Sequence, residues 1–95
     1  MTTPQQDEIL SVLSTMITEV IAEEWVQDFT FTMDTSFAED LELESIEFVA
    51  LAERVQTHFG DQVDFVDWLS GLEIDAIIQL SLGELVEFIE RCLNA

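Results

Sequence analysis

The chain has 95 residues, with 21 Asp and Glu against two Lys and Arg, and its formal net charge is −19. Nucleic acid and anionic membrane surfaces need cationic protein groups, so both are excluded as partners, and partners with basic patches are expected instead. Because 48% of the residues are hydrophobic, the chain is not a disordered acidic tail. We expect one small domain over residues 1–95, monomeric and charged on its outside.

The single cysteine, Cys92, cannot form an internal disulfide, which favours a reducing, cytoplasmic location. Its place on an apolar helical flank predicts a small buried side chain. The first residues lack Lys and Arg, so no secretion signal is expected. No stretch is long and apolar enough to span a membrane.

Residues 4–24 are predicted to form a helix. Thr3 is placed to cap it, Pro4 suits the first helical position, and Gln6 completes a T-x-x-Q capping box. Apolar residues then follow helical spacing at Ile9, Leu13, Met16 and Val20.

Residues 25–44 lose this spacing. Phe29, Phe31 and Met33 alternate with threonines as in a strand, but no second strand is available for pairing, so we predict an extended loop. The segment contains apolar residues that can pin it to the helices, and it should therefore be ordered. These residues are Trp25, Phe29, Phe31, Phe37, Leu41 and Leu43.

A second long helix is predicted over residues 45–59, ended by Gly60 in a left-handed conformation. Residues 64–80 are apolar but broken at Ser70 and Gly71, which predicts one or two short helical turns. Ser81 and Glu84 form an S-x-x-E capping box before a last helix that reaches the C-terminus. The predicted fold is all-α, a small four-helix bundle with three main helices, a short weak third helix and a long ordered first loop.

No residue pattern predicts catalysis. The only histidine, His58, would have to serve Ser45 in a Ser-His-acid triad, but the two lie on one predicted helix about 20 Å apart. We expect His58 on the surface near the helix end. The sequence lacks a Cys/His cluster for zinc and a calcium-loop motif, so no metal site is predicted.

Ser45 is a lone hydroxyl among five carboxylates, those of Glu39, Asp40, Glu42, Glu44 and Glu47. One interpretation is structural, because serine is a favoured helix N-cap. However, Phe48 occupies the position at which a capping box needs Glu or Gln, so the capping signal is incomplete. The other interpretation is a functional serine, and the local sequence leaves both open.

Residues 40–49, D-L-E-L-E-S-I-E-F-V, resemble the D-L-G-x-D-S-L modification motif that opens the second helix of acyl carrier proteins. The match continues to Phe59 and Gly60, where that helix commonly ends. Residues 81–89, S-L-G-E-L-V-E-F-I, look like the start of the family's last helix, often T-V-G-D-L-V-x-x-I. Length, acidity and helix order fit over nearly the whole chain.

This resemblance implies that the chain is a carrier and not an enzyme. A phosphopantetheinyl transferase would attach 4'-phosphopantetheine covalently to Ser45, and the thiol of this arm would hold an acyl group as a thioester. Glu44, Ile46, Glu47 and Val49 would contact the transferase and the acyl-loading and synthase enzymes, through basic docking surfaces on those partners.

The chain departs from the family pattern at three positions, where Glu42 replaces the usual Gly, Glu44 the usual Asp and Ile46 the usual Leu. Arg54 and His58 also make the second half of the second helix less acidic than in fatty-acid carriers. These departures argue against service to the general fatty-acid synthase. Residues 67–79 are also longer and more apolar than in the simplest carriers, and in this they resemble carriers of polyketide-type or other dedicated acyl pathways.

Two alternatives stay open at the level of the sequence. An aminoacyl or peptidyl carrier would use the same arm for a different cargo. An unmodified acidic helical adaptor would bind a basic partner without any arm. Phe48, Val55, Ile74 and Leu85 are named for either a cavity or a packed core, because periodicity does not distinguish a packed core from an inducible pocket.

Repulsion among the acidic groups should destabilise the fold at low ionic strength, because salt screens exposed charges from one another. We predict that the melting temperature, followed by circular dichroism, rises as NaCl increases from about 10 mM to about 300 mM. A melting temperature that stays flat over this range would contradict the prediction.

Overall fold

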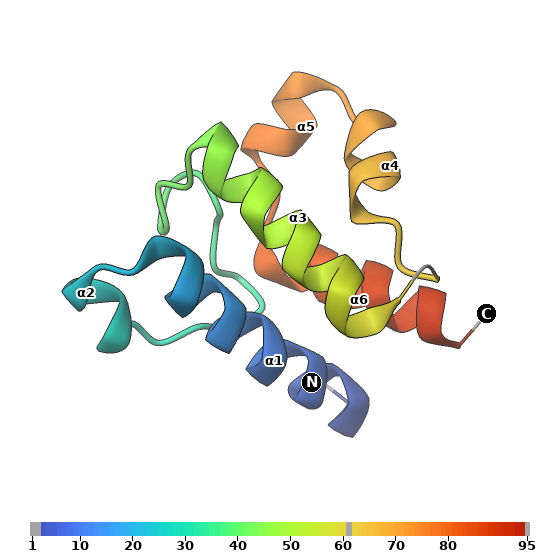
Figure 1. Cartoon of the computed structure of the whole chain (residues 1–95), viewed down its shortest axis with the longest axis horizontal. Helices are drawn as coiled ribbons and strands as arrows, with labels where there is room; N and C mark the ends of the chain where they lie inside the picture. Colours follow the sequence, from blue (N-terminus) through green and yellow to red (C-terminus); the bar gives the residue numbers. More distant parts are fainter. Residues whose placement is uncertain (1–2, 61, 95) are drawn as a thin grey trace.

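The computed structural model describes residues 3–60 and 62–94, and this part of the chain is all-α as predicted (Figure 1). The helices are α1 (Pro4–Ile21), α2 (Glu24–Gln27), α3 (Ser45–Phe59), α4 (Phe65–Ser70), α5 (Ile74–Ile78) and α6 (Leu82–Leu93). The long helices α1, α3 and α6 correspond to the three predicted main helices. In these residues no strand forms, and Phe29 to Met33 lie in an extended loop, as predicted.

The short helices differ from the expected four-helix pattern. The predicted weak third helix is divided into α4 and α5, with the break at Gly71. The first loop also contains α2, which the sequence analysis missed, and α1 ends at Ile21 instead of residue 24. The cause is Ala22, whose left-handed backbone (φ 54°) turns the chain so that Val26 of α2 can be buried.

Both predicted capping boxes are present. At the start of α1, the backbone N–H of Gln6 donates to Thr3 Oγ1 over 3.1 Å, and the N–H of Thr3 donates to Gln6 Oε1 over 3.2 Å. At the start of α6, Glu84 N–H donates to Ser81 Oγ over 3.3 Å, and Ser81 N–H donates to Glu84 Oε2 over 3.1 Å. Each pair satisfies backbone donors that the first helical turn leaves without a partner.

Gly60 ends α3, but in a conformation other than the predicted one. Its φ of 86° is positive, as expected, whereas its ψ of −172° is extended and not left-handed helical. This combination is essentially restricted to glycine. The N–H of Gly60 still donates to the carbonyl of Gln56, so the last turn of the helix is closed before the chain leaves toward α4.

The core lies among the three long helices. α1 packs against both α6 and α3, while α4 packs on the other side of α3 (Figure 1). The buried side chains of the long helices are Ile9, Leu13, Met16 and Ile17 of α1, Leu51, Ala52 and Val55 of α3, and Leu82, Leu85, Val86 and Ile89 of α6.

The long first loop is fixed to this core by side chains and by its backbone. Phe37 and Leu41 are buried, as predicted for loop anchors. The N–H groups of Leu82 and Gly83, in the first turn of α6, donate to the carbonyls of Thr35 and Met33 over 2.7 and 2.8 Å. The loop therefore supplies acceptors that a helix N-terminus lacks within itself.

Two side chains are less buried than expected. Trp25 is 39% exposed, and its ring meets Phe29 edge-on instead of entering the core. Cys92 is half-buried, because it packs against the edge of the core and not inside it. Within residues 3–60 and 62–94, no helix is both long enough and apolar enough to cross a membrane.

We predict that Gly83→Ala lowers the stability of the fold. A Cβ at position 83 would lie 2.6 Å from the carbonyl oxygen of Met33, so the loop would have to move away from α6. Overpacking of this kind costs about 1–3 kcal/mol. The free energy of unfolding, measured in urea by circular dichroism, should fall by that amount.

Gly71→Ala is the matched control. A Cβ there would meet only the Trp68 carbonyl at 3.6 Å and the Asp67 carbonyl at 4.0 Å, both ordinary contacts. Since Gly71 has a negative φ of −82°, we expect this variant to be neutral or slightly stabilised. Equal effects of the two substitutions would mean that the loop is not held at Gly83.

Candidate functional site

Ser45 is the first residue of α3 and does not occupy the N-cap position. Glu44 holds that position, with an extended backbone of φ −83° and ψ 164°. The interpretation of Ser45 as the helix N-cap is therefore wrong, because the chain enters the helix one residue earlier than that role requires. The Ser45 side chain lies outside the described part of the structure, so its hydroxyl stays a sequence-based prediction.

The backbone around Ser45 is held by hydrogen bonds on both sides. The N–H of Glu44 donates to Glu47 Oε1 over 2.9 Å, and the N–H groups of Glu47 and Phe48 donate to the Glu44 carbonyl over 3.0 Å each. Residue 45 thus begins a 15-residue helix with a fixed first turn. The free N–H groups and positive dipole end of such a turn favour a phosphate group.

The five carboxylates near Ser45 do not share one role. Asp40 Oδ2 accepts the N–H of Ser36 over 2.7 Å, and Glu47 helps to close the first turn of α3, so these two hold the backbone. Glu39, Glu42 and Glu44 are exposed. This second group provides a negative surface at the beginning of α3.

A hollow of about 500 Å³ lies beside this helix start. Its walls come from the end of α1, from α2 and from the segment before α3, and they include four carboxylates and the Trp25 ring. The lining residues are Ile21, Glu23, Trp25, Leu41, Glu42, Glu44 and Glu47. Such a hollow attracts cationic groups of a partner, whereas no group of His, Cys, Asp and Glu in the described chain is arranged to hold a metal ion.

The predicted partner-binding residues are largely accessible. Ile46 is 74% exposed and Val49 is 58% exposed, which is high for large apolar side chains in a folded domain. Glu44 is exposed, and Glu47 is partly exposed beside them. Acidic and apolar groups therefore lie together on the first turns of α3, a combination suited to a basic protein surface with an apolar centre.

Glu42 has a left-handed backbone, with φ 51°. The N–H of Leu41 donates to the Ser36 carbonyl and that of Leu43 donates to the Phe37 carbonyl, so the residues on both sides of Glu42 are fixed. Between these two fixed residues, the turn is made with the positive φ of Glu42. Sequence reasoning missed this strain, although the glycine that the acyl carrier motif usually has at this position was a signal for it.

His58 is exposed at the last turn of α3, at the opposite end from Ser45, as predicted, so the two cannot act together. Of the four residues named for a cavity or a packed core, Phe48 and Ile74 do line an apolar hollow of about 310 Å³ between α3 and α5. Val55 and Leu85 do not, because both are fully buried in the core.

We predict that Glu42→Gly stabilises the fold. A left-handed backbone destabilises a residue other than glycine by about 1–2 kcal/mol, and glycine removes this strain. The greater freedom of glycine in the unfolded chain offsets part of the gain. The free energy of unfolding should rise by about 0.5–1 kcal/mol, measured in urea.

Glu39→Gly is the control, because it removes the same charge from the same segment at a residue without a positive φ. This variant should lose stability, by up to about 1 kcal/mol. A stability loss in both variants would show that Glu42 is not strained.

Comparison with known proteins gives one informative similarity. The acyl carrier protein of Rhodococcus erythropolis (strain PR4 / NBRC 100887) is 28% identical to this chain over 86 residues, which cover 90% of this chain and 82% of that protein. No protein-family model matches the chain, and no solved structure matches it. The chain is thus similar to an acyl carrier protein over most of its length.

Proposed function

We propose that this chain is an acyl carrier protein, formed by a single domain over residues 1–95, that holds acyl groups as thioesters on 4'-phosphopantetheine attached to Ser45. The observation that carries the proposal is the position of Ser45 in the first turn of α3, inside the D-L-x-x-x-S motif. The similarity to a named acyl carrier protein over 90% of the chain supports it.

The attachment is a phosphoryl transfer. The Ser45 oxygen attacks the phosphorus next to pantetheine in coenzyme A, a phosphodiester forms, and adenosine 3',5'-bisphosphate leaves. The hydroxyl proton passes to a base of the transferase. No activating residue is required in this chain, which agrees with the distance of His58 from the helix start.

The charge balance at the first turn of α3 tolerates the modification. The phosphodiester adds a negative charge where the helix dipole and free N–H groups favour one. Glu42 and Glu44 oppose it, but both are exposed, so their repulsion is screened to about 1 kcal/mol or less per pair.

The same charges define the partners that we propose. A phosphopantetheinyl transferase, and later the acyl-loading and synthase enzymes, would use basic surfaces to contact Glu44, Ile46, Glu47 and Val49. A charge of −19 disfavours association between copies, so the carrier would act as a monomer. We place it in the cytoplasm, where its single cysteine stays reduced.

The cargo is proposed to be acyl and not aminoacyl. The acidic residue before Ser45, Glu44, and the acyl carrier similarity favour this assignment. Among acyl pathways, Arg54 and His58 in α3 favour a polyketide-type or other dedicated pathway, because general fatty-acid carriers are more acidic along this helix.

Intact mass spectrometry tests the proposal. After incubation with coenzyme A and a broad-specificity phosphopantetheinyl transferase, the chain should gain one phosphopantetheinyl group. Ser45→Ala should gain none, because the attacking oxygen is absent. Loading assays with acyl and aminoacyl donors on the modified chain then separate the two types of cargo.

Ser70→Ala is the control substitution. Ser70 is exposed in α4, where its hydroxyl donates to the Val66 carbonyl, so this variant should gain the arm like the parent chain. If the parent gains no arm under conditions that modify a known carrier, the proposal fails and an unmodified acidic adaptor becomes the better interpretation.

A further inference from the structure

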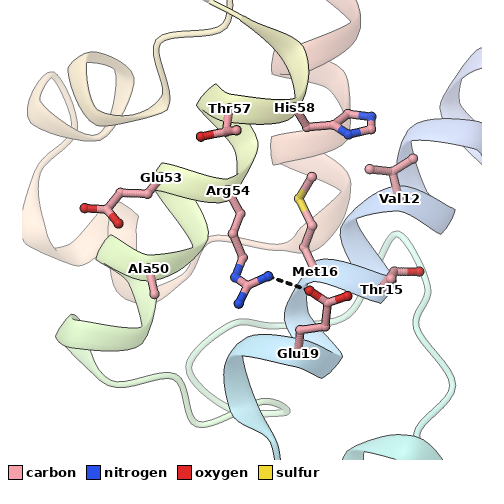
Figure 2. A pocket seen from close by; sticks show the side chains of 9 residues that line it. All are labelled: Val12, Thr15, Met16, Glu19, Ala50, Glu53, Arg54, Thr57 and His58. Atoms are coloured by element: carbon pink, nitrogen blue, oxygen red, sulfur yellow. Dashed lines mark hydrogen bonds and ion pairs between the residues drawn. The ribbon is translucent and has the colours of Figure 1, made fainter.

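A groove of about 910 Å³ lies between α1 and α3 (Figure 2). α1 and α4 pack on opposite sides of α3, so the groove faces away from α4 (Figure 1). Val12 and Met16 of α1 give it apolar surface, and Arg54 and His58 of α3 line its other side. The function proposed above leaves this groove without a role.

The groove contains one of the two arginines of the chain and its one histidine. The sequence has two Arg, one His and no Lys, and the groove includes both Arg54 and His58. Figure 2 shows Arg54 reaching from α3 toward Glu19 of α1, with which it forms an ion pair. Glu53, also on α3, points away from α1. Because Glu19 and Glu53 also line the groove, Arg54 is a cationic group set among carboxylates.

The groove is continuous with the predicted partner-binding surface. Ile46, Ala50, Glu53 and Thr57 follow the spacing of one helix face, and the last three line the groove. Ala50 is five residues after Ser45, about 7.5 Å farther along the helix axis. A stable protein interface covers about 800 Å² on each partner, so an enzyme that reaches Ser45 along this face also reaches the groove.

A uniform negative field attracts a basic partner but does not orient it. Orientation requires groups of both charge signs on the docking surface. Only the correctly placed partner then meets every group with an opposite charge, and a misplaced partner is repelled. Arg54 is one such group. Its pair with Glu19 is exposed, with 44% and 54% of the two side chains accessible, so a partner carboxylate can take over Arg54 at little cost.

We propose that the α1–α3 groove is the orienting half of the docking surface for the phosphopantetheinyl transferase. A segment of this basic enzyme enters the groove and pairs one of its carboxylates with Arg54, while its cationic groups meet the acids around Ser45. This inference rests on the function proposed above, and it adds a specific docking contact to it.

Two charge reversals test the proposal against simple attraction. Arg54→Glu and Arg91→Glu give chains of the same net charge, and Arg91 is exposed on α6, where it lines a different hollow beside Trp68. The probe is the same transferase with coenzyme A, and the readout is kcat/KM for modification of Ser45. If the transferase responds only to net charge, both variants should be modified equally well, and at least as fast as the parent.

The proposal expects different results for the two variants. Arg91→Glu should be modified at the rate of the parent or faster, whereas Arg54→Glu should lose about tenfold in kcat/KM, as expected for one misplaced charge in a docking contact. Equal values for the two variants, whether raised or lowered, would overturn the proposal.

Folding is checked by melting curves for each variant. Glu19 and Glu53 would repel the new carboxylate of Arg54→Glu. If this lowers the melting temperature of that variant, the uncharged substitutions Arg54→Gln and Arg91→Gln are compared instead of the charge reversals. Only Arg54→Gln should then lose rate, and equal rates would overturn the proposal. If the parent chain gains no arm, the proposed function itself fails. If the parent and the Arg54 variant are modified equally well, the proposed function stands and only the docking role of the groove is refuted.

Discussion

The backbone contact between the first loop and α6 fixes the geometry on which the candidate site depends. Gly83 has no side chain, and this lets the Met33 carbonyl approach within hydrogen-bonding distance of the helix N-terminus. In the same loop Phe37 and Leu41 are buried, and the N–H groups of Leu41 and Leu43 donate to the carbonyls of Ser36 and Phe37, so the segment before α3 is held against the core. The start of α3, and with it Ser45, is therefore positioned by a contact made on a different helix.

The long helices could be predicted from the sequence because their signals are local. Gly60 marked the end of α3 after Phe59, and the capping boxes at Thr3 and Ser81 marked the starts of α1 and α6. The short helix α2 could not be predicted in this way. It has four residues, too few to show a period, and it depends on the left-handed turn at Ala22 and on burial of Val26 by the rest of the fold.

The residues of the candidate site were proposed from the sequence, whereas the local backbone geometry around them could not be predicted from it. The family motif drew attention to Ser45 and its acidic neighbours. The capping preference of serine suggested Ser45 as the N-cap, whereas the chain uses Glu44 there. The strain at Glu42 and the supporting hydrogen bond of Asp40 depend on how the loop returns to the core. The groove between α1 and α3 likewise arises from residues more than thirty positions apart, such as Glu19 and Arg54, which no local pattern connects.

The exposed α5 helix has a consequence for how this fold can diversify. Ile74 is 76% exposed, and none of the residues of α5 is buried, whereas α6 contributes four fully buried side chains to the core. A change in α5 therefore alters the surface beside the apolar hollow without disturbing the packing that supports the rest of the chain. Substitutions at this short segment can therefore vary one surface of the fold while the core stays the same.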